Sequence, residues 1–584
     1  MKKIILLIAA FSGLFLTQSL AQKMSVQWSK KQFYENKLDG FFDGFIGGNS
    51  KYIYAKFSNY TTKKVKGFDK RVKLLVFDKL TMKKVGDQTL IDVKDKKKAK
   101  KYEGLKYYST IVFEDVLHVF WTKDSKTGRD LYAESYNSKL KSVMKLKKVY
   151  AVKSGGKSGK YAQLFVMGTG DVSQKVLIGA EVSSAKGGKV VTKYKLLNSD
   201  LSFAEANQFT LPIVTTRKGL GPTSRYELGA DNNLHVKTSV RLSREERKKA
   251  KKGAATSYTI YSVVDLETGN LRTYPIKFDN KNIFDFDFIV SKNSIKIFGL
   301  FSDLVKDPRG NDTHGIFHGV LDSKSLELND LNFSYFTKTQ LDNLFAGDRD
   351  ERRRKKSTRS NKKKKSKDES IAANYVIEYV QAVDDRNIVL FCSRMNNYSV
   401  RTCDSKGNCS TNYYCEKSNV TAFKIAHDGS IEWASNLDRK ITYSGWNIFD
   451  LRVAYKSGRL YVTYGSNYAI SAEKKKGSTK KSKRYKSDRF EYAVFDYETG
   501  QFFKKEYKVN RLDTPKKDRK TISAMSIQVI DGAFYTSSTK LKIKPQGYII
   551  GCASALVCAP LILLPWYLPS FRRGDGYLAS ISLD

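Results

Sequence analysis

The stretch Ser262-Val263-Val264-Asp265-Leu266-Glu267-Thr268-Gly269 decides the fold, because its pattern returns along the whole chain. A run of apolar, mostly β-forming residues ends in Asp, Asn or an equivalent residue, and a tight polar turn follows. Most of these ends lie 57 to 70 residues apart, and the two longer intervals, 104 and 88, contain insertions. Repetition at a fixed period indicates a repeat architecture. The ends are Asp78, Asn137, Asn198, Asp265, Asp322, Ala426, Asp496 and Asp584.

Each repeat reads as four short strands, since alternating apolar and β-branched residues are bounded by Gly, Asn and Asp. A single four-stranded sheet cannot bury both of its faces, so neighbouring repeats must stack, and radial stacking gives a β-propeller. We therefore predict an all-β protein with one β-propeller over 22–584, with eight blades favoured over seven. The last repeat ends after its third strand, 576–583, and we expect 25–29 to supply the fourth strand and close the ring.

The N-terminus has the features of a secretory signal. Lys2 and Lys3 precede an apolar run over 4–16, and a small-x-small site ends at Ala21, so the mature chain is expected to begin at Gln22. No cysteine follows the apolar run, so a lipoprotein anchor is not expected. We predict export to the periplasm or to the surface of a bacterium, where six cysteines can form disulfides.

Three turns resemble those of a known family. Asp265 to Gly269 and Asp496 to Gly500 read Asp-x-x-Thr-Gly, and 428–433 reads Asp-Gly-x-x-x-Trp, as in quinoprotein-like eight-bladed propellers. That family includes quinone-dependent dehydrogenases and non-enzymatic exported scaffolds. The resemblance implies the fold. Most repeats lack the docking tryptophan of the dehydrogenases, so we predict no cofactor.

The insertions fall unevenly on the predicted ring. In a propeller, the loop between strands two and three and the connection between blades emerge on one face, and the other two turns emerge on the opposite face. The long segments all belong to the first set: a basic, disordered insertion at 338–370, a cysteine-bearing one at 393–419, a basic one at 466–488 and an apolar one at 545–573. One face is therefore expected to carry the positive charge of a chain whose formal net charge is +46.

Two of these insertions contain the candidate anion-binding residues. A single like-charge run is often only a solvated loop, but several runs on one face attract anions together. Sequence-specific nucleic-acid binding is not expected, because the runs are rich in lysine and no base-stacking or groove-binding motif accompanies them. The candidates are Arg352, Arg353, Arg354, Lys355, Lys356, Lys362, Lys363, Lys364, Lys365, Lys474, Lys475, Lys476, Lys480, Lys481, Lys483 and Arg484.

An almost uncharged segment, 549–568, lies in the last repeat between basic residues. Its length would suffice for a transmembrane helix, but Pro560, Pro565 and Pro569 disfavour one. Three interpretations stay open: a membrane span, a loop that enters a membrane surface or a partner, and a hairpin packed on the propeller. The contact candidates are Ile549, Ile550, Leu561, Ile562, Leu563, Leu564 and Trp566.

The cysteines suggest three disulfides. Cys392 and Cys415 would face each other at the base of one loop, Cys403 and Cys409 would pair at its tip, and Cys552 and Cys558 would pair in the apolar segment. A zinc site is the alternative, although C-x-x-C pairs are absent. The histidines His118 and His235 fall in strands, and His314 and His318 lie too far apart in a strand to share a metal, so no catalytic or metal site is predicted.

These features predict an exported, monomeric, non-enzymatic propeller that binds an anionic surface or polymer. The expected partners are envelope lipid, lipopolysaccharide or acidic polysaccharide, or an envelope protein for which the propeller is a scaffold. The alternative is a quinoprotein-like or glycan-processing enzyme whose site lies at the central channel, because propeller enzymes can assemble a site from several blades.

Overall fold

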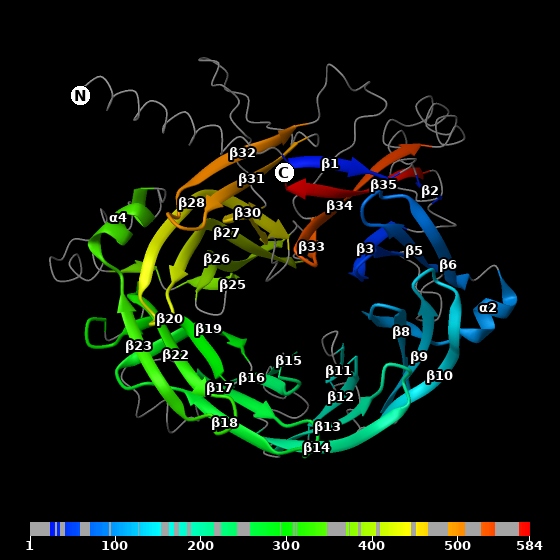
Figure 1. The fold of residues 1–584 in the computed structure, drawn as a ribbon, viewed down its shortest axis with the longest axis horizontal. Coiled ribbons are helices and arrows are strands. Elements are labelled where there is room, and N and C mark those ends of the chain that lie inside the picture. The colour runs from blue at the N-terminus through cyan, green and yellow to red at the C-terminus, as the bar shows by residue number, and fades with distance from the viewer. Residues whose placement is uncertain are drawn as a thin grey trace.

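The computed structural model describes most of the chain, and all but one small pair of its described strands belong to eight sheets around a central opening (Figure 1). The described residues are 24–29, 32–35, 41–58, 71–92, 95–125, 128–153, 163–168, 174–183, 189–214, 224–229, 231–241, 257–291, 294–307, 310, 312–346, 370–372, 374–383, 387–403, 409–444, 451–464, 489–508, 527–543 and 572–583.

Seven blades are complete four-stranded antiparallel sheets. Blade I contains β3 (Phe41–Gly48), β4 (Tyr52–Ser58), β5 (Arg71–Asp78) and β6 (Lys84–Asp92). Blade II contains β7 (Lys106–Val112), β8 (Val116–Asp124), β9 (Gly128–Asn137) and β10 (Ser142–Lys153). Blade III contains β11 (Gln163–Gly168), β12 (Val176–Ser183), β13 (Lys189–Leu197) and β14 (Phe203–Val214). Blades IV and V contain β15 (Ser224–Leu228), β16 (Leu234–Arg241), β17 (Ser257–Val264) and β18 (Leu271–Ile276); and β19 (Lys281–Val290), β20 (Ser294–Asp303), β22 (Gly315–Asp322) and β23 (Leu328–Tyr335). Blades VI and VII contain β25 (Tyr375–Ala382), β26 (Ile388–Cys403), β27 (Cys409–Ile425) and β28 (Ile431–Ser444); and β29 (Arg452–Lys456), β30 (Arg459–Thr463), β31 (Arg489–Asp496) and β32 (Phe502–Lys508).

Blade VIII joins the two ends of the chain. It contains β33 (Gln528–Ile530), β34 (Ala533–Ile543) and β35 (Arg572–Leu583), and β1 (Met24–Trp28) pairs antiparallel with β35, from Met24 opposite Leu583 to Trp28 opposite Ala579. A further N-terminal strand, β2 (Gln32–Glu35), pairs with the other half of β35. The predicted closure is thus confirmed, and the blade number is eight. The chain is an eight-bladed β-propeller.

The core is divided among the blade interfaces. Eight clusters of buried apolar side chains each join two neighbouring blades; one, for example, packs Leu300 of blade V against Leu390 and Phe423 of blade VI. The first strands of most neighbouring blades also touch each other around the opening. Each blade therefore depends on two others for its burial, as expected for a closed ring.

The repeated acidic turns have a local cause. Oδ1 of Asp265 accepts a hydrogen bond from the backbone N–H of Thr268 at 3.0 Å, and Oδ1 of Asp496 accepts one from the N–H of Thr499 at 2.9 Å. The glycine that follows adopts a left-handed backbone, with φ 74° at Gly269 and 68° at Gly500, which glycine accommodates without strain. The motif is therefore that of a stable hairpin turn.

The same turns connect neighbouring blades. The indole of Trp433 in β28 donates a hydrogen bond to the carbonyl of Tyr497 at 3.0 Å, and Asn332 in β23 donates one to the carbonyl of Asp428 at 2.9 Å. In both cases the fourth strand of one blade contacts the turn of the next blade. The repeated turn therefore also packs neighbouring blades together, in addition to closing its own hairpin.

Among the described residues, two helices lie in connections between blades: α2 (Lys96–Lys101) and α4 (Lys338–Ala346). The prediction of a disordered insertion from 338 onward is wrong at its start, because α4 buries Leu341, Leu344 and Phe345 against blades V and VI. The remainder of that insertion, 347–369, lies outside the described residues. A short pair, β21 (Asp312–Thr313) with β24 (Ile371–Ala372), lies on either side of it. In the part of the chain that the structure describes, no helix meets the length and apolarity of a membrane span.

Candidate anion-binding face and channel wall

The strand order divides the connections between two faces. The turn face is the side on which strands one and two, and strands three and four, of each blade are joined. The connection face is the side on which strands two and three are joined and on which the chain passes to the next blade. Because neighbouring strands are antiparallel in every blade, the predicted insertions all leave and re-enter the sheets at the connection face.

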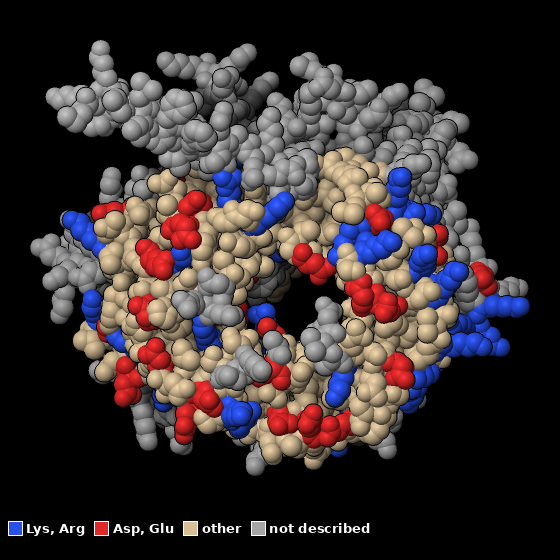
Figure 2. All heavy atoms as spheres, viewed as in Figure 1, with Lys and Arg blue, Asp and Glu red and all other residues tan. Residues whose placement is uncertain are grey.

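Acidic side chains predominate on the turn face. Figure 2 shows one side of the ring, where Asp and Glu recur around a central opening. The described turns contain the acids Glu114, Asp115, Asp200, Asp231, Asp265, Glu267, Glu327, Asp428, Glu498 and Asp531, against Lys51, Lys79, Lys83, Lys139, Lys141, Lys175 and Lys324. This acidic excess contrasts with the net charge of the whole chain, so the positive charge must lie elsewhere.

Helix α2 is a described part of the basic connections. It joins blades I and II on the connection face, and Lys97 and Lys100 are exposed there. Lys and Arg gather over this helix at the right-hand rim in Figure 2. The C-terminal end of α2 is fixed by Glu134, whose carboxylate accepts hydrogen bonds from Lys101 Nζ at 2.9 Å and from the hydroxyl of Tyr102 at 2.7 Å.

The Glu134 anchor is almost completely buried. Only 1% of its side chain is exposed, and the indole of Trp121 donates a third hydrogen bond to it at 3.0 Å. Burial and the adjacent Glu134 carboxylate raise the pKa of Tyr102 far above its ordinary value, so the phenol remains protonated and donates. Because this end of α2 is fixed, the exposed lysines of the helix stay at the rim of the ring.

A second anchored cluster lies inside blade VI. Glu378 in β25 lies 3.0 Å from Lys417 Nζ and 3.1 Å from Arg439 Nη2, and all three side chains are fully buried. Arg439 also donates to the hydroxyl of Ser393 at 2.7 Å. These groups tie all four strands of blade VI together at the base of the long β26–β27 hairpin.

The channel wall carries a mixed-charge cluster on blades IV and V. Arg225 and Glu227 lie on β15, the innermost strand of blade IV, and their side chains are 68% and 47% exposed, so they face the central opening. Lys237 Nζ lies 3.2 Å from Asp285 Oδ1, and Asp285 Oδ2 accepts a hydrogen bond from the N–H of Ile377 in blade VI at 3.0 Å. Asp285 therefore connects three blades at the wall.

Two carboxyl groups of this wall hold their protons more strongly than usual. Partial burial, together with the charge of Asp287, raises the pKa of Glu227, although Arg225 opposes the shift. Burial raises the pKa of Asp287 as well, against the nearby charges of Lys237 and Arg225. The sequence contains no spacing signal for this cluster, because its members come from different blades.

The predicted site residues are placed only in part. The anion-binding candidates from Arg352 to Lys365 and from Lys474 to Arg484 lie outside the described residues. So do Cys552, Cys558 and the contact candidates from Ile549 to Trp566. The strand ends on either side of these segments belong to the connection face, as the repeat pattern predicts.

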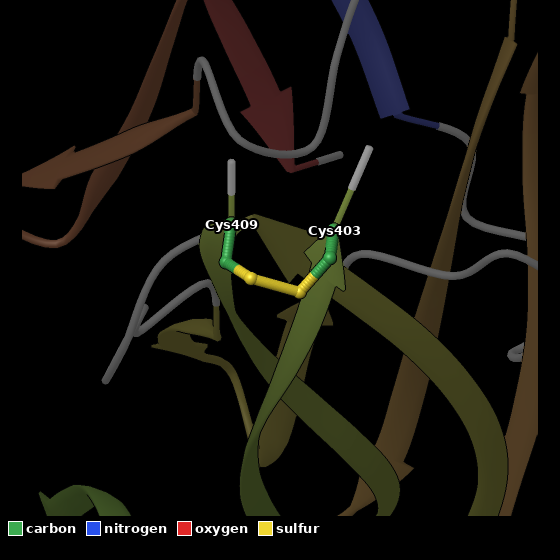
Figure 3. The surroundings of a disulfide bond; sticks show 2 residues. All are labelled: Cys403 and Cys409. Atoms are coloured by element: carbon green, nitrogen blue, oxygen red, sulfur yellow. A yellow bond between two sulfur atoms is a disulfide. The ribbon is translucent and has the colours of Figure 1, made fainter. Parts of the chain in front are cut away.

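The cysteines of blade VI agree with one prediction and contradict another. Cys403 and Cys409 form a disulfide across the end of the hairpin (Figure 3). The predicted Cys392–Cys415 pair is not formed, and both are buried free thiols. The reason is the strand register: Cys392 lies opposite Thr421 and Cys415 opposite Asn397, because the strands continue far beyond the blade.

Four buried histidines lie in or beside the described strands. His118 accepts or donates a hydrogen bond with Ser135 at 2.7 Å, and His235 bonds both Tyr261 and Asp231. His314 and His318 are buried as well. Among the described residues, no group of three or more His, Cys, Asp or Glu is arranged to hold a metal ion.

Comparisons with known proteins give no family. No protein-family model and no curated protein matches the chain. Similar solved structures include the polysaccharide lyase Uly1, at 9% identity over 81% of this chain and 89% of that chain with a TM-score of 0.34. They also include the β-propeller domain of the Trilobed protease from Pyrococcus furiosus, at 8% identity over 65% of this chain and 93% of that chain with a TM-score of 0.27.

A third similar structure is the endo-arabinase from Bacteroides thetaiotaomicron VPI-5482, at 12% identity over 52% of this chain and 98% of that chain with a TM-score of 0.22. At these identities the similarity says nothing about activity, and the fold assignment rests on the strand order. The resemblance to quinoprotein-like propellers finds no support in these matches and remains a hypothesis.

Proposed function

We propose that the protein is an exported, non-enzymatic propeller whose connection face binds an anionic surface or polymer of the cell envelope. One observation supports this function above all: the strand ends that flank the lysine-rich segments lie on one face, while the described turns on the other face contain more acids than lysines. Such a charge distribution orients the molecule as it approaches a polyanion and raises the rate of association. Lysine supplies point charges, which suit repeated anions of low specificity.

The test measures binding of the chain over 22–584 to anionic vesicles and to a soluble acidic polysaccharide across a series of salt concentrations. Affinity should fall steeply with salt, because exposed charges are screened within about 8 Å at physiological ionic strength. Deleting 352–367 together with 474–486 should remove most of the binding. Binding that is indifferent to salt and to both deletions would refute the proposal.

A matched pair of variants distinguishes the effect of charge on the connection face from the effect of total charge. Lys97→Gln with Lys100→Gln removes two charges from α2 on the connection face, and Lys139→Gln with Lys141→Gln removes two from the turn face. All four lysines are exposed. The α2 variant should bind anionic vesicles roughly thirtyfold more weakly, because each of the two lysines contributes about 1 kcal/mol near such a surface. The turn-face variant should bind like the unchanged protein.

A second candidate function, an enzyme that processes a glycan at the channel, is favoured by the wall cluster of Arg225, Glu227 and Asp287. Carboxyl groups with raised pKa values can act as general acids near neutral pH. Release of new chain ends from an acidic polysaccharide, lost in Asp287→Asn, would support it. Binding without any cleavage would favour the first function.

A further inference from the structure

A cavity of about 300 Å³ lies on the turn face between blades III and IV, and this volume is that of a small-molecule site. The two blades are neighbours in the ring, and one cluster of buried apolar side chains joins them (Figure 1). We name this cavity the III–IV pocket. The residues that line it include Lys175 before β12, Leu196 in β13, Asp231 in the β15–β16 turn, and Asp265, Leu266 and Glu267 in the β17–β18 turn.

Hydrogen bonds hold the wall of the III–IV pocket in place from both sides. The hydroxyl of Tyr194 in blade III donates a hydrogen bond to the carbonyl of Leu266 in blade IV at 2.9 Å. In the β15–β16 turn, Oδ1 of Asp231 lies 2.9 Å from Nε2 of His235, and only 7% of the Asp231 side chain is exposed. The polar groups of the wall are therefore positioned before a ligand arrives, which lowers the entropy cost of binding.

Carboxylates outnumber cations in this wall. Asp231, Asp265 and Glu267 are acids, and Lys175 is basic. The Glu267 side chain is exposed, and within the described part of the chain it forms no ion pair or hydrogen bond. Backbone N–H groups of its own turn lower the pKa of Asp265; burial would raise the pKa of Asp231, but its interactions with His235 keep it below the ordinary value. A ligand that balances the charge of this wall is therefore a cation.

The rest of the wall narrows the class of cation. Leu196 and Leu266 line the same cavity, and they suit the methylene groups of an aliphatic chain. None of the described lining residues is aromatic, which disfavours a quaternary ammonium ion, and no described group of His, Cys, Asp and Glu is arranged to hold a metal ion. The acids come from two separate turns, Asp231 from one and Asp265 and Glu267 from the other, so the wall offers places for two positive groups.

We propose that the III–IV pocket binds a small organic dication, in which a short aliphatic chain joins two primary ammonium groups. One ammonium group pairs with Asp231 and the other with Asp265 and Glu267, while the chain lies along Leu196 and Leu266. A primary ammonium group donates three hydrogen bonds, which suits carboxylate oxygens. The pocket lies on the face opposite to the connection face, so this inference goes beyond the proposed function and does not rest on it.

The experiment measures the binding of putrescine, a short linear diamine, to the chain over 22–584 by titration calorimetry at low salt. The test variant combines Asp265→Asn with Glu267→Gln. It should bind putrescine roughly tenfold more weakly, because each of two partly screened ion pairs contributes up to about fivefold. The turn itself should persist, since asparagine keeps the Oδ1 that accepts the hydrogen bond from the N–H of Thr268.

Blade VII supplies a matched control for this variant. Asp496→Asn with Glu498→Gln makes the same two changes in the same Asp-x-Glu-Thr-Gly turn, at a place that does not line the pocket. The control variant should bind putrescine like the unchanged protein. Equal weakening in both double variants would show diffuse attraction to the acidic turn face and would overturn the inference.

Three further ligands test the class of molecule. Butylamine, which has one ammonium group, should bind more weakly than putrescine, and butanediol, which has none, should not bind. Ca²⁺ should not displace putrescine. The inference is overturned if putrescine shows no saturable binding to the unchanged protein, or if butanediol or Ca²⁺ binds at least as tightly as putrescine.

Discussion

Glu378 is the residue on which the interior of blade VI depends most. Its carboxylate lies between the buried cations Lys417 and Arg439. We expect Glu378→Gln to lower the free energy of unfolding by about 3–5 kcal/mol, because it removes the negative charge that contacts two buried cations. Denaturant titration measures the loss.

Asp87 provides the control for that substitution. It pairs with Lys73 and Lys84 at the surface and is 38% exposed. Asp87→Asn should cost less than about 1 kcal/mol, since exposed ion pairs contribute little. Equal losses for the two variants would mean that the buried cluster is not a special source of stability.

His118 should make the fold sensitive to acid. Burial lowers the pKa of this histidine from 6.5 to about 4, so the folded chain resists the proton that the unfolded chain accepts. Stability should therefore decrease as the pH falls from about 6.5 to about 4, by up to roughly 3 kcal/mol from this group. In His118→Asn this part of the decrease should disappear, whereas His427→Asn, at an exposed position, should keep it. Melting temperatures between pH 4 and 7 provide the measurement.

At the residue scale, the sequence predicts what depends on neighbours along the chain. The Asp265 and Asp496 turns could be foreseen, because the accepting carboxylate and its N–H donor are three residues apart. The Cys403–Cys409 bond could be foreseen for the same reason. Glu378, Arg439 and the channel wall could not, since strand register and blade neighbours bring their members together. The failed Cys392–Cys415 pairing is a register error of this kind.

Among the elements, β1 covers the edge of β35 and so closes the ring. Val26 packs against the cluster between blades VII and VIII, whereas Gln27 beside it is exposed. We expect Val26→Asp to lower the melting temperature and to promote aggregation, because loosening β1 uncovers the edge of β35. Gln27→Asp, which adds the same charge on the same strand, should change stability by no more than about 0.5 kcal/mol. Thermal denaturation with light scattering distinguishes the two outcomes, and similar behaviour of both variants would contradict a sealing role for β1.

The sequence of helix α4 contains helix-forming features that the basic residues after it made easy to miss. The Thr337 hydroxyl accepts a hydrogen bond from the N–H of Gln340, and the Gln340 side chain accepts one from the N–H of Thr337. This capping box, followed by Leu341, Leu344 and Phe345 at helical spacing, indicates an amphipathic helix. The basic residues that follow led to the whole insertion being interpreted as disordered. Composition averaged over a long segment thus hides a short element at its end.

At the scale of the whole molecule, the eight interface clusters imply one cooperative unit. Each cluster needs two blades, so loss of one blade exposes the apolar faces of its neighbours. We expect a single unfolding transition by calorimetry, and we expect Val26→Asp and Glu378→Gln to lower that same transition by amounts that add, because the two sites share no partner. A second transition appearing in either variant would show that blades unfold independently.

The sequence predicted the blade number and the ring closure correctly, because both follow from the repeat. Eight similar turns gave the blade number, and an unpaired last repeat gave the closure by 25–29. The expectation that the basic insertions share one face follows from blade topology and stays a prediction, because 352–367 and 474–486 lie outside the described residues. The length of the β26–β27 hairpin did not follow, because the sequence does not show that β26 and β27 stay paired as far as Cys403 and Cys409.

The shared sheet of β1 and β35 has a consequence for biosynthesis. Strand β1 is made long before its partner β35, so the sheet that contains both cannot form until the intervening blades have been made, however early those blades assemble. Until β35 follows, that edge of the ring stays unsealed. The ring locks only when the late strand pairs with the early one.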